Sequence, residues 1–155
     1  MKRIDWINNE NINENINIDL DNIGHEEELE IFIKLWGDNN SQLNIVANHL
    51  AKETKSRIKI RAIIDDKAKL KIKGTVRIAK GMKGSDTYFD AKILTLSEKA
   101  VGNITPGLEI DENDVKAGHA ASITNVSERD MFYLMSRGLD QKNSERLIVE
   151  GFLKR

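Results

Sequence analysis

Cysteine is absent from this chain of 155 residues, and proline occurs once. Without thiolates the chain alone cannot form a disulfide, a cysteine nucleophile, a zinc finger or any metal centre held by its own sulfur. No apolar run approaches the roughly 20 residues that a bilayer-spanning helix needs, and no apolar signal core follows Met1. We therefore expect a soluble, cytoplasmic protein of one domain, long enough to build a core without covalent staples.

Motifs of the common enzyme classes are also missing. The sequence has no phosphate-binding glycine loop, no serine nucleophile elbow and no His-Glu-x-x-His helix. Asp65 and Asp66 form a carboxylate pair only by sequence, because adjacent residues of a strand point to opposite faces, so they indicate a turn. The sequence predicts no active site, and we expect a protein that is not an enzyme.

The net charge of −1 hides an asymmetry along the chain. Residues 1–30 hold nine acids against Lys2 and Arg3, whereas residues 52–83 hold twelve bases against three acids. Such a chain can pair with itself or with a charged partner. The basic segment has no aromatic residue for base stacking, so a solvated face is favoured over nucleic-acid binding, and alternating lysines also protect a sheet edge.

Apolar residues alternate with polar ones through most of the chain, which predicts strands. The segment from Ile7 to Leu20 is expected to form a weak strand at the end of a sheet, and Thr105-Pro106-Gly107 is expected to form a turn. The clearest strands hold Leu29 to Leu35, Leu43 to His49, Ile58 to Ile64 and Ala68 to Ile78, about ten residues apart. This spacing fits either an antiparallel meander or the coils of a β-solenoid.

The hydrophobic period changes from two to 3.6 after about Val126. Ser127 is a suitable N-cap, Gly138 suits the left-handed position that ends a helix, and Asp140 can cap a second helix. We expect a β body over residues 1–126, with residues 1–42 as N-terminal capping strands, and a two-helix tail over residues 127–155. The tail concentrates apolar side chains, of which some should pack on the body and some can meet a partner: Met131, Phe132, Tyr133, Leu134, Met135 and Phe152.

Three histidines are candidate catalysts or ligands. His25 lies in an acidic turn and is expected to be solvated, while His49 lies inside a strand and is expected to be packed or hydrogen-bonded. His119 is flanked by glycine and alanine, which leave its imidazole accessible, and it is the candidate metal ligand. No second histidine is close in sequence, and the nearby acids are Glu109, Asp111, Glu112 and Asp114.

Several runs near the C-terminus resemble one known family. They are Pro106-Gly-Leu-Glu-Ile, Asp114-Val-Lys-Ala-Gly-His-Ala-Ala, Met131-Phe-Tyr-Leu-Met-Ser-Arg-Gly-Leu and Arg146-Leu-Ile-Val-Glu-Gly-Phe. Together with strands from about Asn44 onward, they are similar to the C-terminal part of the SufB/SufD family, the scaffold proteins of iron–sulfur cluster assembly.

This resemblance implies a right-handed parallel β-helix with a helical tail that docks on a SufC-like ABC-type ATPase. The implied docking residues are Met131, Phe132, Tyr133, Arg137, Gly138 and Phe152. It also implies that two such chains, a homodimer or a heterodimer with another SufB/SufD-like chain, pair through the end of the β-helix. The implied pairing residues are Asp114, Lys116 and His119, and a transient iron–sulfur cluster forms in the family at that interface.

The sequence departs from the family pattern at the ligand positions. Alanine replaces the SufD-type cysteine at Ala117, the SufB-type acid at Ala120 and the SufB-type cysteine at about Ala91, so only His119 remains. Full family members are two to three times longer. We therefore carry three hypotheses: a reduced scaffold that binds the ATPase and pairs through its β-helix, a structural or regulatory partner of the ATPase that ligates no cluster, and a nucleic-acid-binding β protein.

Overall fold

The computed structural model describes residues 1–7 and 10–154, and the described chain is built from nine strands and two helices. The elements in chain order are β1 (Lys2–Ile7), β2 (Asn13–Leu20), β3 (Glu26–Leu35), β4 (Asn40–His49), β5 (Lys55–Ile64), β6 (Lys69–Ile78), β7 (Asp86–Thr95), β8 (Val101–Ile110), β9 (Lys116–Asn125), α1 (Glu128–Ser136) and α2 (Gln141–Lys154). As expected, strands fill the first part of the chain and helices the last.

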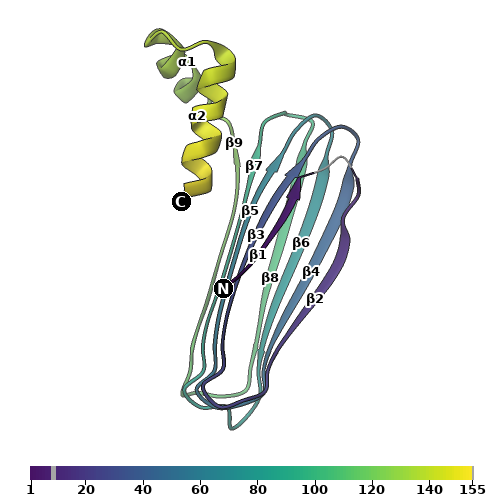
Figure 1. The fold of residues 1–155 in the computed structure, drawn as a ribbon, viewed down its shortest axis with the longest axis vertical. Helices are drawn as coiled ribbons and strands as arrows, with labels where there is room; N and C mark the ends of the chain where they lie inside the picture. Colours follow the sequence, from purple (N-terminus) through teal and green to yellow (C-terminus); the bar gives the residue numbers. More distant parts are fainter. Residues whose placement is uncertain (8–9, 155) are drawn as a thin grey trace.

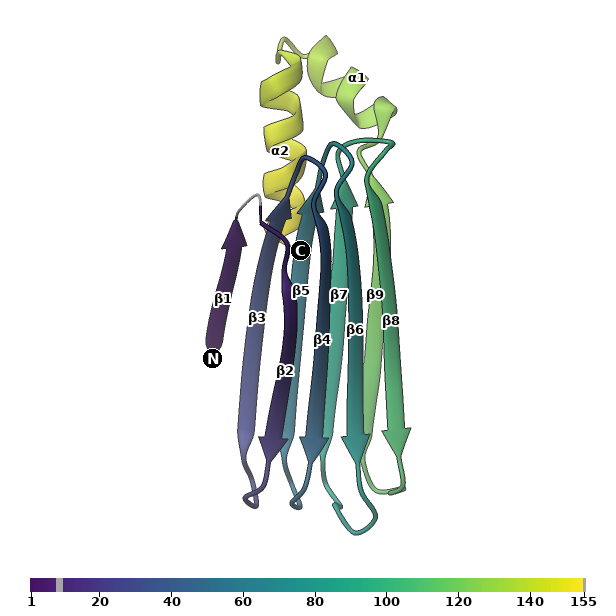
Figure 2. The ribbon, with the colours of Figure 1, turned by 90° about the vertical axis from the view of Figure 1, so that its right-hand side faces the viewer.

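The strands form two parallel sheets that face each other (Figure 1). Sheet A has the order β1-β3-β5-β7-β9 and sheet B the order β2-β4-β6-β8, so the chain alternates between sheets and adds one strand to each in every coil. Figure 2 shows the odd strands running toward the helices and the even strands running away from them. Of the two architectures that strand spacing left open, the parallel β-solenoid is therefore correct.

Equivalent positions recur every 29 to 32 residues, and they stack in columns along the solenoid. Leu29, Ile58 and Phe89 form one such column in sheet A, and all three are buried. Sheet B contributes matching columns of buried aliphatic residues, such as Leu43 and Ile72. Because every strand turns alternate side chains inward, the two sheets share one continuous apolar core.

The predicted turn at Thr105-Pro106-Gly107 is wrong, because these residues lie in the middle of β8. The amides of Val101 and Asp111 donate to the carbonyls of Ala68, just before β6, and of Ile78, at its end, at 2.9 and 3.0 Å. Residues between them with the same orientation are therefore the odd-numbered ones. Pro106 therefore turns its nitrogen to the open edge of sheet B, where a missing N–H costs no ladder bond.

Strand β7 begins at Asp86, well before Ile93. Strand β9 lies within the expected β body, but alternation did not predict it as a strand, because its small residues hide the pattern. The expected strand from Ile7 to Leu20 corresponds to β2, which does lie at the end of sheet B, while Asn8 and Asn9 lie outside the described residues.

The helical tail begins and ends where local signals place it. Ser127 caps α1 by accepting a hydrogen bond from the Asp130 amide at 3.3 Å, and Gly138 follows the helix with a φ of 93°. Asp140 accepts from the Asn143 amide at 2.7 Å before α2. Neither helix described here is long and apolar enough to cross a membrane.

Helix α2 runs back along the outer face of sheet A, near the carboxyl ends of its strands (Figure 1). Ile63 and Leu94 point outward from β5 and β7, yet only 1% and 2% of their surfaces are exposed. Residues of α2 lie close to both of them. Val149 lines one hollow together with Ile63, and Ile148 lines another together with Leu94. The apolar stripe of α2 thus packs on the body, as the sequence indicated for part of the tail.

Candidate functional site: the open end and the helical tail

Strand β9 is the last strand of sheet A, and it leaves one end of the solenoid open. His119 lies in register with the buried Phe89, so its side chain belongs to the inward-facing column. No further described strand follows β9 in the sheet, and His119 is therefore exposed. The structure confirms the accessibility that was expected from its small neighbours.

The backbone of β9 offers unpaired groups at this edge. The amides of Lys116 and Val126 donate to the carbonyls of Ser85, just before β7, and of Thr95, at its end, at 2.9 and 3.1 Å. Even-numbered residues therefore face β7. Odd-numbered residues, including His119 and Ala121, direct their N–H and C=O groups away from the sheet. An exposed strand edge of this kind is a template for pairing with another chain.

Small residues flank the imidazole on both sides. A Cβ on Gly118 would lie 3.1 Å from Cδ2 of Tyr88, so the tyrosine ring lies close over this glycine. Ala117 and Ala120 are half-buried, and neither adds a polar group beside the imidazole. The arrangement gives His119 steric access from the open end and no polar partner in its own strand neighbours.

Two of the acids near His119 in sequence have partners elsewhere. Glu112 accepts hydrogen bonds from the amides of Gly81 and Asn113, at 2.9 and 3.0 Å, and these bonds hold the pKa of its carboxyl below the usual range. Glu109 pairs with Arg77 at 2.7 Å. In the described part of the chain no three His, Asp or Glu side chains are placed to hold a metal ion, so the acids Glu109, Asp111, Glu112 and Asp114 do not form a site with His119.

The predicted pairing residues lie at the start of β9. Lys116 is its first residue, and Asp114 lies just before it, with its carbonyl accepting from the Gly84 amide at 2.7 Å. Both side chains are exposed near the open end. Their role in pairing stays a prediction.

Helix α1 presents large apolar side chains to solvent and buries none of its residues. Phe132 is 75% exposed and Tyr133 is 56% exposed. The guanidinium of Arg137 lies over the Tyr133 ring, 5.3 Å from its centroid, which is within cation–π range. Of the other expected docking residues, Gly138 is exposed, whereas Met131 and Phe152 are half-buried between the helices and the body.

A groove of about 610 Å³ separates the tail from the outer face of sheet A. One wall is formed by β7 and β9, including Leu94 and Thr124. The opposite wall comes from both helices, with Tyr133, Leu147 and Phe152. The aromatic face of α1 is thus continuous with an apolar hollow against the solenoid.

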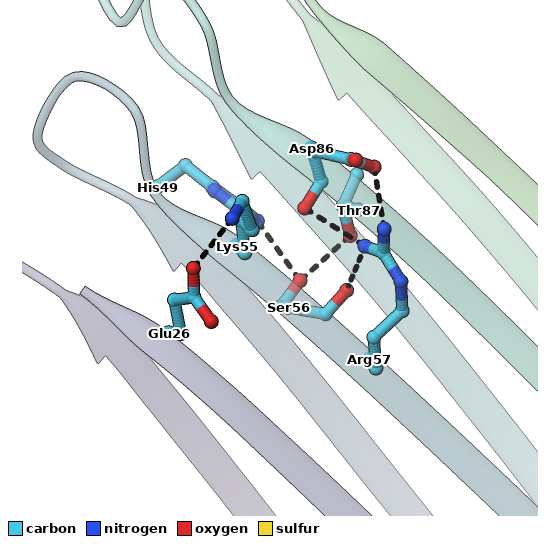
Figure 3. Close-up of polar contacts among 7 residues, drawn as sticks. All are labelled: Glu26, His49, Lys55, Ser56, Arg57, Asp86 and Thr87. Carbon is cyan, nitrogen blue, oxygen red and sulfur yellow. Dashed lines mark hydrogen bonds and ion pairs between the residues drawn. The ribbon is translucent and has the colours of Figure 1, made fainter. Parts of the chain in front are cut away.

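The basic strand β5 is neutralised by its neighbours in sheet A. Lys55 pairs with Glu26 of β3, and Arg57 pairs with Asp86 of β7 at 2.9 Å (Figure 3). Further along the strand, Lys59 and Arg61 pair with Glu30 and Asp90. The acidic N-terminal segment and the basic middle segment therefore do pair within the chain, at positions one coil apart.

His49 is buried at the end of β4 and is fully hydrogen-bonded. Its Nδ1 atom lies 2.8 Å from Thr54 Oγ1. Its Nε2 atom lies 2.9 Å from Ser56 Oγ, and Ser56 in turn bonds Thr87 at 2.7 Å (Figure 3). Burial lowers the pKa of His49, with a smaller opposing effect from Asp86. The packed interpretation of this histidine is confirmed.

His25 is less solvated than its acidic turn suggested. It is half-buried, with Nδ1 3.8 Å from Asp21 and Nε2 4.0 Å from Glu27. His25 lies in the turn between β2 and β3, and this turn is at the end of the solenoid farthest from α1 (Figure 2).

The described residues thus form a parallel β-solenoid with an open last coil and a helical tail. The sequence model "SUF system FeS cluster assembly, SufBD core domain" matches residues 6–152. This chain therefore belongs to the SufBD family, and the match extends the resemblance, which began near Asn44, almost to the N-terminus.

Curated relatives agree with this family. The chain is 39% identical over 105 residues to the iron–sulfur cluster assembly protein SufD of Bacillus subtilis, and 30% identical over 106 residues to SufB of the same organism. A SufBD family protein of Mycobacterium tuberculosis is 33% identical over 106 residues. Each alignment covers 68% of this chain but only 24%, 23% and 12% of the respective relative, so the chain spans about a quarter or less of their length.

Sequence reasoning missed the partners that the coils bring together. The acids that neutralise β5 come from strands 29 residues away, and the hydroxyls that bond His49 come from Thr54 and Ser56, beyond the turn that follows β4. Such pairs have a sequence signal only once the coil length is known, because the register then aligns Glu26 with Lys55.

Proposed function

We propose that this chain is a scaffold subunit of iron–sulfur cluster assembly in the cytoplasm, and that its helical tail binds a SufC-like ABC-type ATPase. The observation that supports this most is the exposure of Phe132 and Tyr133 together on α1. Large aromatic side chains on a short helix with no buried residue gain free energy when a partner covers them. The family membership of the chain supports an ATPase as that partner.

The local geometry suits a binding hot spot. Tyrosine and arginine are enriched at the centres of interfaces, and here Arg137 already lies over the Tyr133 ring. This stacking reduces the side-chain freedom that binding would otherwise remove. The adjoining groove offers a place for an apolar side chain of the ATPase beside Leu147 and Phe152.

Pairing with a second SufBD-type chain is proposed for the open edge of β9. The odd-numbered residues of β9 carry free backbone groups, whereas the matching edge of β8 lacks a donor at Pro106. Pairing through β9 would extend sheet A across the two chains. The partner is a second copy of this chain or another family member, and Asp114, Lys116 and His119 would lie at the contact.

The iron–sulfur cluster is the cargo of this assembly, and the described residues do not provide a ligand set for it. His119 is one accessible imidazole, and the chain has no cysteine. Ala91, at the position of a family cysteine, is fully buried in β7. We propose that His119 supplies a single ligand and that the paired chain supplies the others.

Co-purification tests the docking proposal. The intact chain should retain the ATPase, and Tyr133→Ala combined with Phe132→Ala should lose it. Ile23→Ala is a matched control, because Ile23 is 74% exposed in the turn between β2 and β3, at the opposite end of the solenoid. Retention of the ATPase by the double variant would contradict the proposal.

A second candidate function is a structural or regulatory partner of the ATPase that ligates no cluster. The alanines at 91, 117 and 120 favour it, because they stand where relatives carry ligands or acids. Anaerobic reconstitution of the complex with iron and sulfide separates the two. A chromophore that is lost in His119→Ala supports the ligating scaffold, whereas a colourless complex with full ATPase coupling supports the second candidate.

A further inference from the structure

Strand β6 carries a row of lysines on the outer face of sheet B, and these lysines differ from the bases of β5 in sheet A in having no acidic partner among the described residues. Lys69, Lys71 and Lys73 point outward from β6, and all three are exposed. Across the described residues none of them forms an ion pair, in contrast to the four paired bases of β5. The three positive charges therefore remain available on the surface.

Protection of a sheet edge does not account for these lysines. Strand β6 lies between β4 and β8, so its edges are already paired. The neighbours in register on β4 are Asn40, Gln42 and Asn44, and those on β8 are Val101, Asn103 and Thr105. The row is thus flanked by amides, a hydroxyl and one apolar side chain, with no acid beside it on either strand.

We propose that this lysine row, defined as Lys69, Lys71 and Lys73, is a docking surface for an acidic helix of a partner protein. Alternate residues of a strand lie about 6.6 Å apart, so the three amino groups repeat at that interval along the face. Carboxylates at positions i, i+4 and i+8 of a helix repeat at about 6 Å. The two spacings match closely enough for flexible lysine side chains to reach all three carboxylates.

A helix is the form of partner that this surface accepts. The face of a sheet offers side chains and no free backbone groups, and a helix satisfies its own backbone internally. A helix about 10 Å wide covers the strand spacing of about 4.8 Å on each side of β6. The flanking amides of Gln42 and Asn103 can then bond polar side chains at the rim of the contact.

Single-stranded nucleic acid is the competing polyanion, and the surface is poorly equipped for it. Base-binding surfaces use aromatic rings or arginine planes for stacking. The outward residues of β4, β6 and β8 include no aromatic, and Arg77 is held by Glu109 at 2.7 Å. A surface of lysines and amides without rings favours carboxylates.

Fluorescence anisotropy with the full chain tests this surface. The probe is a labelled helical peptide with glutamates at i, i+4 and i+8, and the peptide with glutamines at those positions is its control. The variant combines Lys69→Gln, Lys71→Gln and Lys73→Gln. Its matched control combines Lys52→Gln, Lys80→Gln and Lys83→Gln, which remove the same charge from exposed turns at the far end of the strands.

The acidic peptide should bind in a salt-sensitive manner, and the row variant should weaken binding on the order of tenfold at low salt, because three exposed ion pairs are lost. The turn variant should retain binding. The proposal is overturned if both variants weaken binding equally, if the acidic peptide binds no better than its glutamine control, or if a single-stranded RNA oligonucleotide binds the row more tightly than the peptide does.

Discussion

The ring of Phe89 occupies the space that Gly74 leaves empty across the core. Phe89 projects from β7 of sheet A, Gly74 lies in β6 of sheet B, and a Cβ on the glycine would overlap the Cε2 and Cζ atoms of the ring. Phe89 is the register partner of His119, so this contact packs the residue that lies next to His119 in sheet A. Gly74 therefore leaves the space for the buried ring that lies beside the candidate site.

Gly74→Ala should destabilise the fold by about 1 to 3 kcal/mol, because the new methyl group must displace the buried ring. Urea unfolding measures this change. Gly107→Ala is the control, since its nearest neighbour would be Thr75 Oγ1 at 3.6 Å, an ordinary contact. Combining Gly74→Ala with Phe89→Leu should recover part of the loss, and an unchanged stability in Gly74→Ala would show that the ring moves freely.

The stability of the chain should fall as the pH decreases below about 6.5, through His49. Burial lowers the pKa of His49 below its ordinary value of 6.5 in the folded state. Between the folded and unfolded pKa values, the unfolded chain binds a proton that the folded chain does not, so the free energy of unfolding decreases with falling pH. Above pH 7 this contribution is constant.

Urea unfolding at pH 7.5 and 5.5 checks this expectation. The parent chain should lose more stability between the two values than His49→Gln does, because the variant lacks the titrating group. An equal loss in both proteins would assign the pH dependence to other groups.

Helix α2 should be held less firmly on sheet A when an apolar side chain beneath it is removed. Leu94→Ala removes a side chain that is almost fully buried on the outer face of β7 and lines the groove beneath the tail. We expect faster proteolytic cleavage within the tail, measured by mass spectrometry of limited digests, because few other apolar contacts hold the helices. Ile123→Ala on β9 should leave the rate unchanged, since Ile123 does not line that groove.

Much of the fold follows from local signals, and the remainder depends on contacts between coils. Ser127 and Asp140 were correctly predicted as caps, because a cap acts within three residues of itself. Alternation in β3 to β6 predicted the strands but left their direction open, since parallel and antiparallel strands share the same period. Pro106 was misread as a turn, because its tolerance depends on which side of β8 is unpaired.

In the candidate site, too, local features could be predicted from the sequence and contacts between coils could not. The exposure of His119 was expected from its small neighbours, but its structural cause is that no further described strand follows β9. The engagement of Glu112 with the Gly81 amide was not predictable, because it joins turns of successive coils. The contrast between the paired bases of β5 and the unpaired lysines of β6 likewise appears only when the strands flanking each are known.

The open edge of β9 should control pairing of the chain. Ala121→Pro removes an N–H that points away from β7, so we expect this variant to lose the proposed dimer in analytical ultracentrifugation while thermal stability is largely kept. Ser122→Pro is the contrasting control, because its N–H points to β7 and its loss should destabilise the monomer. A dimer that persists in Ala121→Pro would place the contact elsewhere.

The affinity of the intact chain for a SufC-like ATPase, measured by isothermal titration calorimetry, tests the central claim most directly. The account predicts binding by the parent chain and by Ile23→Ala, and a loss of at least about 30-fold in Tyr133→Ala, as expected for a hot-spot residue worth about 2 kcal/mol. Equal affinities of the parent chain and Tyr133→Ala, or no binding by the parent chain, would contradict it.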